Sequence, residues 1–159
     1  MLKLFPRLVS SAALVLGITA ASGVYSEQMV IEEVIVTAQK REQSLQEVPI
    51  AISAFDQQFL DDAGIDDMLE LQFFVPGLTI LNNQSPAQTN INIRGVGTAG
   101  NSLSMESSVG IYVDGVYRAR QSSSIGDLVD IERVEVLKGP QGTLFGKNTA
   151  SGALQILTV

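Results

Sequence analysis

The stretch of residues 130–158 constrains the fold most, because it predicts two strands joined by a glycine-punctuated turn. Within it, residues 133–136 alternate between charged and valine side chains, which is the period of a half-buried strand. Gly139-Pro140 is expected to end that strand, since proline has no N–H to donate to a ladder. Glycines at positions 142, 146 and 152 then predict a tight, irregular connection, and the apolar run 153–159 predicts the second strand.

The residues of this stretch also carry a family resemblance. Residues 132–140 read ERVEVLKGP, residues 142–146 read GTLFG, and Asn148-Thr149 follow. This run resembles the end of the plug domain of TonB-dependent outer-membrane receptors. The family usually continues with a Gly-Ala/Gly-Ile-Asn-Ile pattern. This chain has GALQI at 152–156, a mild change in the last strand.

Two further elements resemble the same plug. One is Ile93-Arg94-Gly95, and the other is YVDG at residues 112–115. The resemblance extends over about residues 31–159 and covers only the plug.

Pattern and resemblance together predict an α+β fold. We expect a small mixed four-stranded sheet with short helices and long apical loops, as in a TonB-dependent receptor plug. Asp114-Gly115 between alternating apolar positions predicts a tight turn. Besides the two strands of the stretch above, strands are expected at residues 48–55, 78–81, 90–94 and 111–117.

Two short helices are predicted between the expected strands at residues 48–55 and 78–81. Asp56 can cap a helix that Gly64 ends, because an aspartate side chain accepts from the first free N–H groups and glycine adopts the left-handed terminus. Asp67 and Glu70 form a capping pattern for a second helix. Asp61, Asp62, Asp66 and Asp67 could resemble a metal site, but carboxylates at helix starts already have a reason to be there.

The N-terminus has the pattern of a secretory signal peptide. Lys3 and Arg7 precede the mostly apolar run 8–18, and the small residues 20–22 offer a cleavage site. The run is too short for a membrane anchor, which needs roughly 17 residues or more. We therefore expect export, with residues 1–22 as signal peptide, 23–46 as a flexible periplasmic segment and 47–159 as the plug domain.

Composition excludes several functions. The net charge of −7 argues against nucleic-acid binding, which requires a basic face. The chain has no Cys and no His, which excludes structural zinc sites, Cys nucleophiles and Ser-His-Asp triads. Residues 142–149 fail the phosphate-loop spacing, because only three residues separate Gly142 from Gly146 and Asn148 follows Lys147. A glycosidase-like carboxylate pair stays open, but nothing points to one. We expect no enzyme and no cofactor.

Residues 31–38 are rich in β-branched side chains and predict a short strand. The polar residues 39–46 beside it offer no evident partner, so it could either add to another protein's sheet edge or be the domain's first strand. The resemblance favours the former. Residues Glu33, Val34, Ile35, Val36, Thr37 and Ala38 resemble the TonB box, the periplasmic segment that the TonB-like energy transducer grips and pulls.

Arg94 and Arg133 are the most informative charges. Each is expected at a strand position with apolar neighbours, and therefore at least partly buried and in need of an acidic partner. That partner could lie within the domain, at Asp130, Glu132 or Glu135. In the family, plug arginines of these two motifs are typically paired with glutamates on the barrel wall, which would make Arg94 and Arg133 a plug–barrel latch.

Three polar loops, at residues 82–89, 98–108 and 118–124, could be plain solvated connections. The resemblance implies that they face outward and touch a ligand, with candidates at Asn83, Gln84, Asn101, Ser102, Arg118 and Arg120. The commonest family ligand is an iron–siderophore complex. Vitamin B12, oligosaccharides and aromatic compounds stay open.

The 159 residues contain none of the 22-stranded outer-membrane barrel that such a receptor needs. The first hypothesis is a receptor plug in the outer membrane, which gates the barrel lumen for uptake of a scarce nutrient and couples to the transducer. In that case the sequence is a fragment of a receptor. The alternative is a free-standing, barrel-less plug that acts as a ligand- or TonB-binding module in the periplasm.

Overall fold

The structure is a computed structural model that describes residues 34–82, 89–98, 106–121, 126 and 128–159. The expected signal peptide, Glu33, Asn83, Gln84, Asn101 and Ser102 lie outside the described residues. In chain order the elements are β1 (Ile35–Val36), β2 (Gln43–Ser44), η1 (Leu45–Glu47), β3 (Ala51–Asp56), α1 (Gln57–Ala63), η2 (Glu70–Phe73), β4 (Leu78–Asn82), β5 (Thr89–Ile93), β6 (Val96–Gly97), β7 (Val109–Val113), β8 (Val116–Arg118), β9 (Ile131–Lys138), α2 (Gly142–Phe145) and β10 (Gly152–Thr158).

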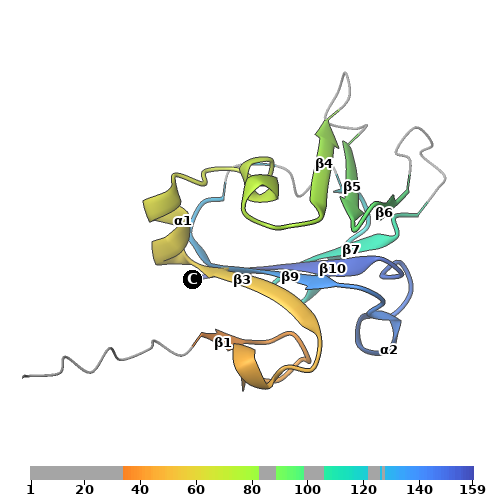
Figure 1. Ribbon diagram of the computed structural model, residues 1–159, viewed down its shortest axis with the longest axis horizontal. Coiled ribbons are helices and arrows are strands. Elements are labelled where there is room, and N and C mark those ends of the chain that lie inside the picture. Colours follow the sequence, from red (N-terminus) through yellow and green to blue (C-terminus); the bar gives the residue numbers. More distant parts are fainter. Residues whose placement is uncertain (1–33, 83–88, 99–105, 122–125, 127) are drawn as a thin grey trace, which may run out of the picture. The chain divides into compact units, whose positions relative to one another are not determined.

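The main sheet has the strand order β3-β9-β10-β7-β8. β10 runs parallel to β7 and antiparallel to β9, so the sheet is mixed, as expected (Figure 1). It has five strands where we expected four, because the turn Asp114-Gly115 places β8 beside β7. Both turn residues have positive φ, 49° and 76°, which is the type I′ geometry that the Asp-Gly pair predicts.

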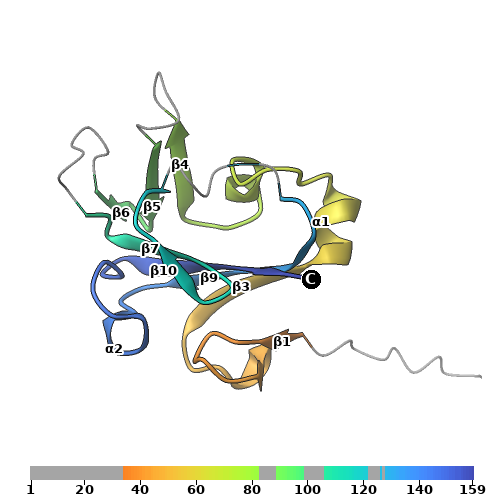
Figure 2. The same cartoon turned by 180° about the vertical axis from the view of Figure 1, so that it is seen from behind.

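One face of the main sheet carries the larger core. Val134 and Val136 of β9 are fully buried there, together with Leu154 of β10. The smaller sheet β4-β5-β6 and the segment containing α1 and η2 lie over this face (Figures 1 and 2). The alternation of valine and charge in β9 therefore has the predicted direction, with the valines inward.

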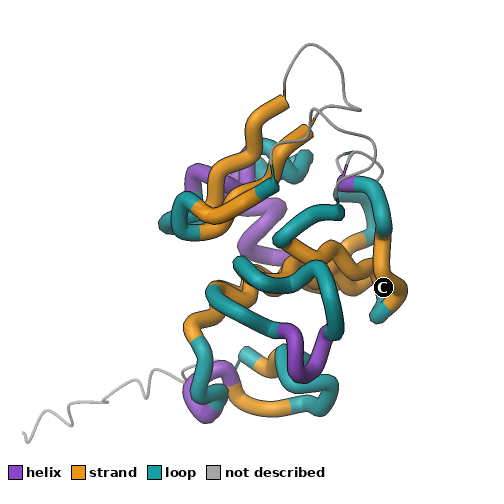
Figure 3. The backbone as a smooth tube through the Cα atoms, turned by 90° about the vertical axis from the view of Figure 1, so that its right-hand side faces the viewer, coloured by secondary structure: helices purple, strands orange, loops and turns teal. Residues whose placement is uncertain are grey.

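The other face is also covered, which the half-buried pattern did not predict. Leu137 and Ala153 are fully buried on it, in a second core cluster with Val36, Ala38 and Phe145. The cover is the β1–β2 hairpin and α2, which lie opposite the smaller sheet (Figure 1), and the layering is seen from the side in Figure 3. Sequence pattern alone missed this layer because it combines a hairpin that precedes β9 by almost a hundred positions with a helical turn that follows β9.

The short helices follow the predicted caps. The Asp56 carboxylate accepts from the Phe59 N–H at 2.8 Å, and Gly64 ends α1 in the left-handed conformation with φ 66°. The Asp67 carboxylate accepts from the Glu70 N–H at 2.9 Å, and the helix that follows is only the 3₁₀ turn η2. Within the described part of the chain, no helix is long and apolar enough to cross a membrane.

The connection between β9 and β10 ends at an obligatory glycine. β9 stops at Lys138, before Gly139-Pro140 as predicted, and the helical turn α2 fills the middle of the connection. Gly152 opens β10 with φ 157°, and a Cβ there would lie 2.4 Å from the Leu137 carbonyl oxygen. Any side chain at position 152 would therefore push β10 away from β9.

Candidate functional site

The N-terminal segment, defined here as Val34–Ala38, is paired within its own chain. Its strand β1 pairs antiparallel with β2, and the Leu45 N–H donates to the Val34 carbonyl at 2.9 Å. The expectation that the polar stretch 39–46 offers no partner was wrong. A two-residue ladder uses backbone groups only, so Gln43 and Ser44 can supply it without apolar side chains. Residues 34–46 thus pack on the plug, although we expected 23–46 to be flexible.

Apolar side chains anchor this segment to the main sheet. Val36 and Ala38 are fully buried against Leu137, Phe145 and Ala153, whereas the Ile35 side chain is 42% exposed. Val36 and Ala38 therefore face the sheet, and Ile35 faces the solvent.

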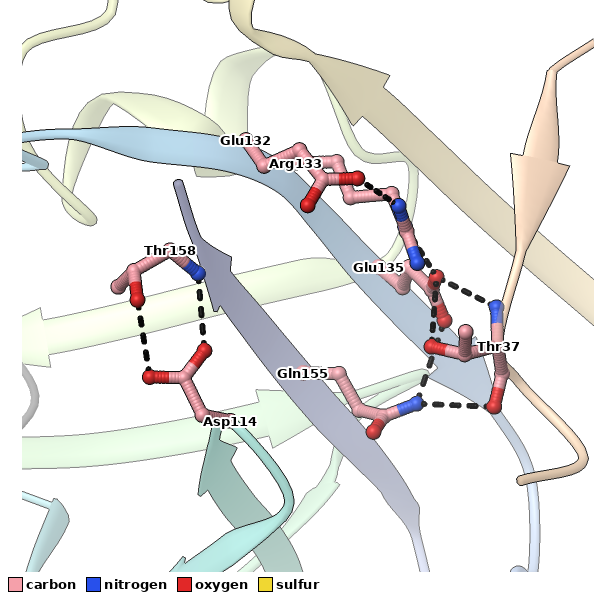
Figure 4. A network of polar contacts seen from close by, with 7 residues as sticks. All are labelled: Thr37, Asp114, Glu132, Arg133, Glu135, Gln155 and Thr158. Atoms are coloured by element: carbon pink, nitrogen blue, oxygen red, sulfur yellow. Dashed lines mark hydrogen bonds and ion pairs between the residues drawn. The ribbon is translucent and has the colours of Figure 1, made fainter. Parts of the chain in front are cut away.

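A buried carboxylate holds the backbone of the segment between these anchors. Glu135 Oε1 accepts from the Thr37 N–H at 2.7 Å and lies 3.2 Å from the Thr37 hydroxyl, which donates to it (Figure 4). The Gln155 amide donates to the Thr37 carbonyl at 3.4 Å and to Glu135 Oε2 at 3.2 Å. Glu135 and Gln155 face each other across β9 and β10, so the sheet itself sets their spacing.

Arg133 supplies the positive charge beside this carboxylate. Its Nε donates to Glu135 Oε1 at 2.9 Å, and its other end pairs with Glu132 (Figure 4). The Arg133 side chain is 14% exposed and that of Glu135 is fully buried. The expectation of partial burial is confirmed for Arg133, and of the two open alternatives for its partner, the structure contains the internal pair. A carboxylate at that depth would be costly without a cation and hydrogen bonds.

Arg94 lies in a different environment from the one expected. It is exposed and occupies the turn between β5 and β6, not a strand, so the expectation of partial burial was wrong. Arg94 and Gly95 have φ 54° and 76°, the pattern of a two-residue hairpin turn. The backbone Arg94 N–H donates to the Gly77 carbonyl at 2.7 Å, which fixes the turn against the start of β4.

The guanidinium of Arg94 lies near the end of β9. A Cβ on Gly139 would be 4.0 Å from the Arg94 Nη1. The pKa of Lys138 is lowered, mainly by burial of its ammonium group and to a smaller extent by the positive charge of Arg94. Among the described residues, neither Arg94 nor Lys138 has an acidic partner. Arg133 is five positions from Lys138 along the strand, on the order of 17 Å away, so the structure does not bring the two predicted latch arginines together.

Two of the predicted ligand-facing residues can be placed. Arg118 ends β8 and Arg120 follows it, and both are exposed. In the turn before β8, the Asp114 carboxylate accepts from both the Thr158 N–H and the Thr158 hydroxyl at 2.9 Å (Figure 4). These hydrogen bonds, with a smaller contribution from Arg118, lower the pKa of Asp114.

Sequence reasoning missed Glu135 and Gln155 as site residues. Each is a polar residue between two apolar residues of a predicted strand. The sequence suggested a role only for Glu135, as a possible partner of Arg133. Only the fold shows that both side chains hydrogen-bond the backbone of Thr37.

Comparison with known proteins identifies the family. The model of the TonB-dependent Receptor Plug Domain family matches residues 44–153. The chain belongs to this plug domain family. The expectation of a receptor element and not an enzyme is confirmed by this membership, and so is the predicted plug fold.

Individual relatives agree with the plug assignment. The pesticin receptor of Yersinia pestis is 38% identical over 99 residues, which cover 62% of this chain and 14% of the relative. The iron-regulated outer membrane virulence protein of Vibrio cholerae is 30% identical over 139 residues, covering 80% of this chain and 20% of the relative. The plug thus spans at most about a fifth of the length of these curated relatives.

Solved structures show the same fold. The ferric yersiniabactin uptake receptor FyuA from Yersinia pestis matches 69% of the plug chain and 17% of its own, with a TM-score of 0.63 and 34% identity. The ferripyoverdine receptor of Pseudomonas aeruginosa matches 79% of this chain and 16% of its own, with a TM-score of 0.63 and 22% identity.

Proposed function

We propose that this plug closes the lumen of a 22-stranded outer-membrane barrel and is moved by a TonB-like energy transducer to admit a scarce nutrient. The observation that carries the proposal is the docking of the N-terminal segment. It is an extended stretch of β-branched residues, held by a two-residue ladder and a few side-chain contacts. Such a strand can leave the plug and add to the sheet edge of a partner, where backbone hydrogen bonds supply affinity.

An iron–siderophore complex is the proposed ligand, and the outer membrane is the proposed location. The support is the similarity to siderophore receptors, among them the ferric yersiniabactin uptake receptor at 34% identity. A vitamin B12 transporter of Vibrio vulnificus is 29% identical over 135 residues, so the ligand must be tested. Cells with the full gene product would be compared for uptake of ferric yersiniabactin and of labelled vitamin B12. Uptake of vitamin B12 alone would refute the siderophore assignment.

Arg94 and Arg133 remain our proposed latch to barrel carboxylates. Arg94 supports the idea through its exposure and the like charge of Lys138 beside it, because two neighbouring cations favour an acidic partner. Arg133 supports it less directly, since its guanidinium already has Glu132 and Glu135 as partners. Charge-reversal pairs that join Arg94→Glu to lysine substitutions of barrel glutamates should restore uptake that the single variants lose.

The transducer contact can be tested with a proline. Val34→Pro removes one backbone N–H from the segment and is expected to abolish binding of the transducer's periplasmic domain. Val34→Thr keeps the N–H and the side-chain shape, so it should bind like the unchanged chain. Unaltered binding of the Val34→Pro variant would refute the role of the segment as a TonB box.

Cell fractionation separates the receptor from the free-standing periplasmic module. An immunoblot with antibody against residues 130–158 should detect an outer-membrane band far above 17.0 kDa if the plug belongs to a receptor. A periplasmic band at or slightly below that mass would establish the barrel-less module instead.

A further inference from the structure

We infer that Arg133 controls the release of the N-terminal segment, because it neutralises the buried carboxylate that holds Thr37. The inference rests on the proposed function, and it adds a regulatory contact to the same site. Breaking the Arg133–Glu135 pair is the event that frees Val34–Ala38 from the plug.

The argument starts from a single oxygen atom. Glu135 Oε1 accepts from the Thr37 N–H at 2.7 Å and from Arg133 Nε at 2.9 Å, and the Thr37 hydroxyl lies 3.2 Å away. Oε2 has the Gln155 amide at 3.2 Å. Segment and arginine therefore share one acceptor, and Arg133 is the group among these that carries a positive charge.

The burial of that oxygen determines whether loss of the Arg133 contact favours the docked or the undocked segment. The Glu135 side chain is fully buried, and the N-terminal segment is part of what covers it. Without the guanidinium, the ionised carboxylate would keep only neutral donors, and a buried charge in that state is strongly unfavourable. Lifting the segment lets water reach the carboxylate, so loss of the Arg133 contact favours the undocked segment.

Arg133 is placed to respond to the surroundings of the plug. Its side chain is 14% exposed, and its second partner, Glu132, is 52% exposed. An external acidic group that draws the guanidinium outward would compete with Glu135 for it. A change in the partner of Arg133 would thereby affect Thr37 through the shared Glu135 Oε1. Arg133 is thus a positioning residue, and this effect requires no movement of β9.

Thiol labelling tests this inference in the full chain. The sequence has no cysteine, so Val36→Cys places a single thiol at a fully buried position of the segment. Its labelling rate reports how often the segment leaves the sheet. Val109→Cys places a thiol in the other core cluster, at 1% exposure, and reports global opening.

Arg133→Gln is expected to speed labelling at position 36 at least tenfold and to leave labelling at position 109 unchanged. The double substitution Arg133→Gln with Glu135→Gln should return the rate at position 36 to near its original value, because the buried charge is gone and an acceptor for the Thr37 N–H remains. Lys147→Gln is the matched control, since it breaks an ion pair with Glu106 whose two side chains are exposed.

The outcomes are decisive in both directions. Fast labelling at position 36 in the chain without the Arg133 substitution would overturn the inference, because the segment would not be docked. Equal acceleration at positions 36 and 109, no acceleration, or no rescue by the double substitution would also overturn it. The assay contains no transducer, so a failure of the proposed TonB coupling would leave these rates unaffected and can be recognised separately.

Discussion

The Thr37 N–H donates to the Glu135 carboxylate at 2.7 Å across 98 positions of sequence. This contact to β9, with the buried side chains of Val36 and Ala38, makes the N-terminal segment part of the packed plug. The contribution of this contact to the free energy of unfolding can be measured by substituting the residues around it.

Glu135→Ala should destabilise the plug by about 1–3 kcal/mol, because it leaves the partly buried Arg133 with only the exposed Glu132 as partner and the Thr37 N–H without an acceptor. The free energy of unfolding in urea measures the effect. Glu132→Ala is the matched control. It removes the other carboxylate from the same arginine, but Glu132 is 52% exposed, and a loss of less than about 1 kcal/mol is expected. Equal losses in the two variants would contradict the central role of Glu135.

Gly152→Ala should destabilise the plug strongly, by about 2 kcal/mol or more, because its Cβ would overlap the Leu137 carbonyl oxygen. Gly142→Ala is the comparison, since a Cβ at position 142 meets nothing within 4 Å and lies in the helical turn α2. It should be neutral or slightly stabilising. Thermal unfolding of the two variants would distinguish them, and a harmless Gly152→Ala would mean that β10 pairs differently with β9.

Acid should loosen the end of β10. Hydrogen bonds from Thr158 lower the pKa of Asp114 in the fold, so its contribution to stability is fully present above the unfolded pKa, about 3.9. That contribution is lost as the pH falls through the lower folded value. The protection of the Thr158 amide, measured as its hydrogen-exchange rate relative to that of an unstructured amide at the same pH, should therefore fall below about pH 4. Asp114→Asn should exchange fast without this pH dependence, and an unchanged acid response in that variant would disprove the assignment.

Tyr112→Phe should cost about 1–3 kcal/mol, because the Tyr112 hydroxyl donates to the Phe145 carbonyl at 2.7 Å in a buried setting. The substitution leaves that carbonyl without its donor while keeping the ring contact. Tyr117→Phe serves for comparison, since its hydroxyl accepts from Asn148 in a less buried position. A smaller loss is expected there, and the reverse order in urea unfolding would contradict the role assigned to Tyr112.

Local rules predicted much of the fold. The Asp56 cap, the Gly64 terminus and the Asp114-Gly115 turn each depend on residues within a few positions of one another, and each is present. Arg94 was misplaced although its signal was local as well. Arg94-Gly95 between alternating apolar residues is itself a turn pattern, and treating Arg94 as the last strand residue hid it.

The candidate site was less predictable because it depends on distant pairing. Glu135 has the pattern of an outward residue of a half-buried strand, but the hairpin of residues 35–44 and α2 together make that face an interior. The hairpin has almost no apolar pattern of its own at Gln43 and Ser44. Its position is set by Val36 and Ala38 against the far side of the sheet, a relationship that no sequence window contains.

The position of β10 has a consequence for the timing of folding. This strand lies between β9 and β7, so before its residues leave the ribosome the main sheet exists only as the separate pairs β3–β9 and β7–β8. Long-range pairing of this kind is slow, and it delays closure of both core clusters until residues 152–158 are available. The pairing of β10 is therefore what joins the two halves of the main sheet into one.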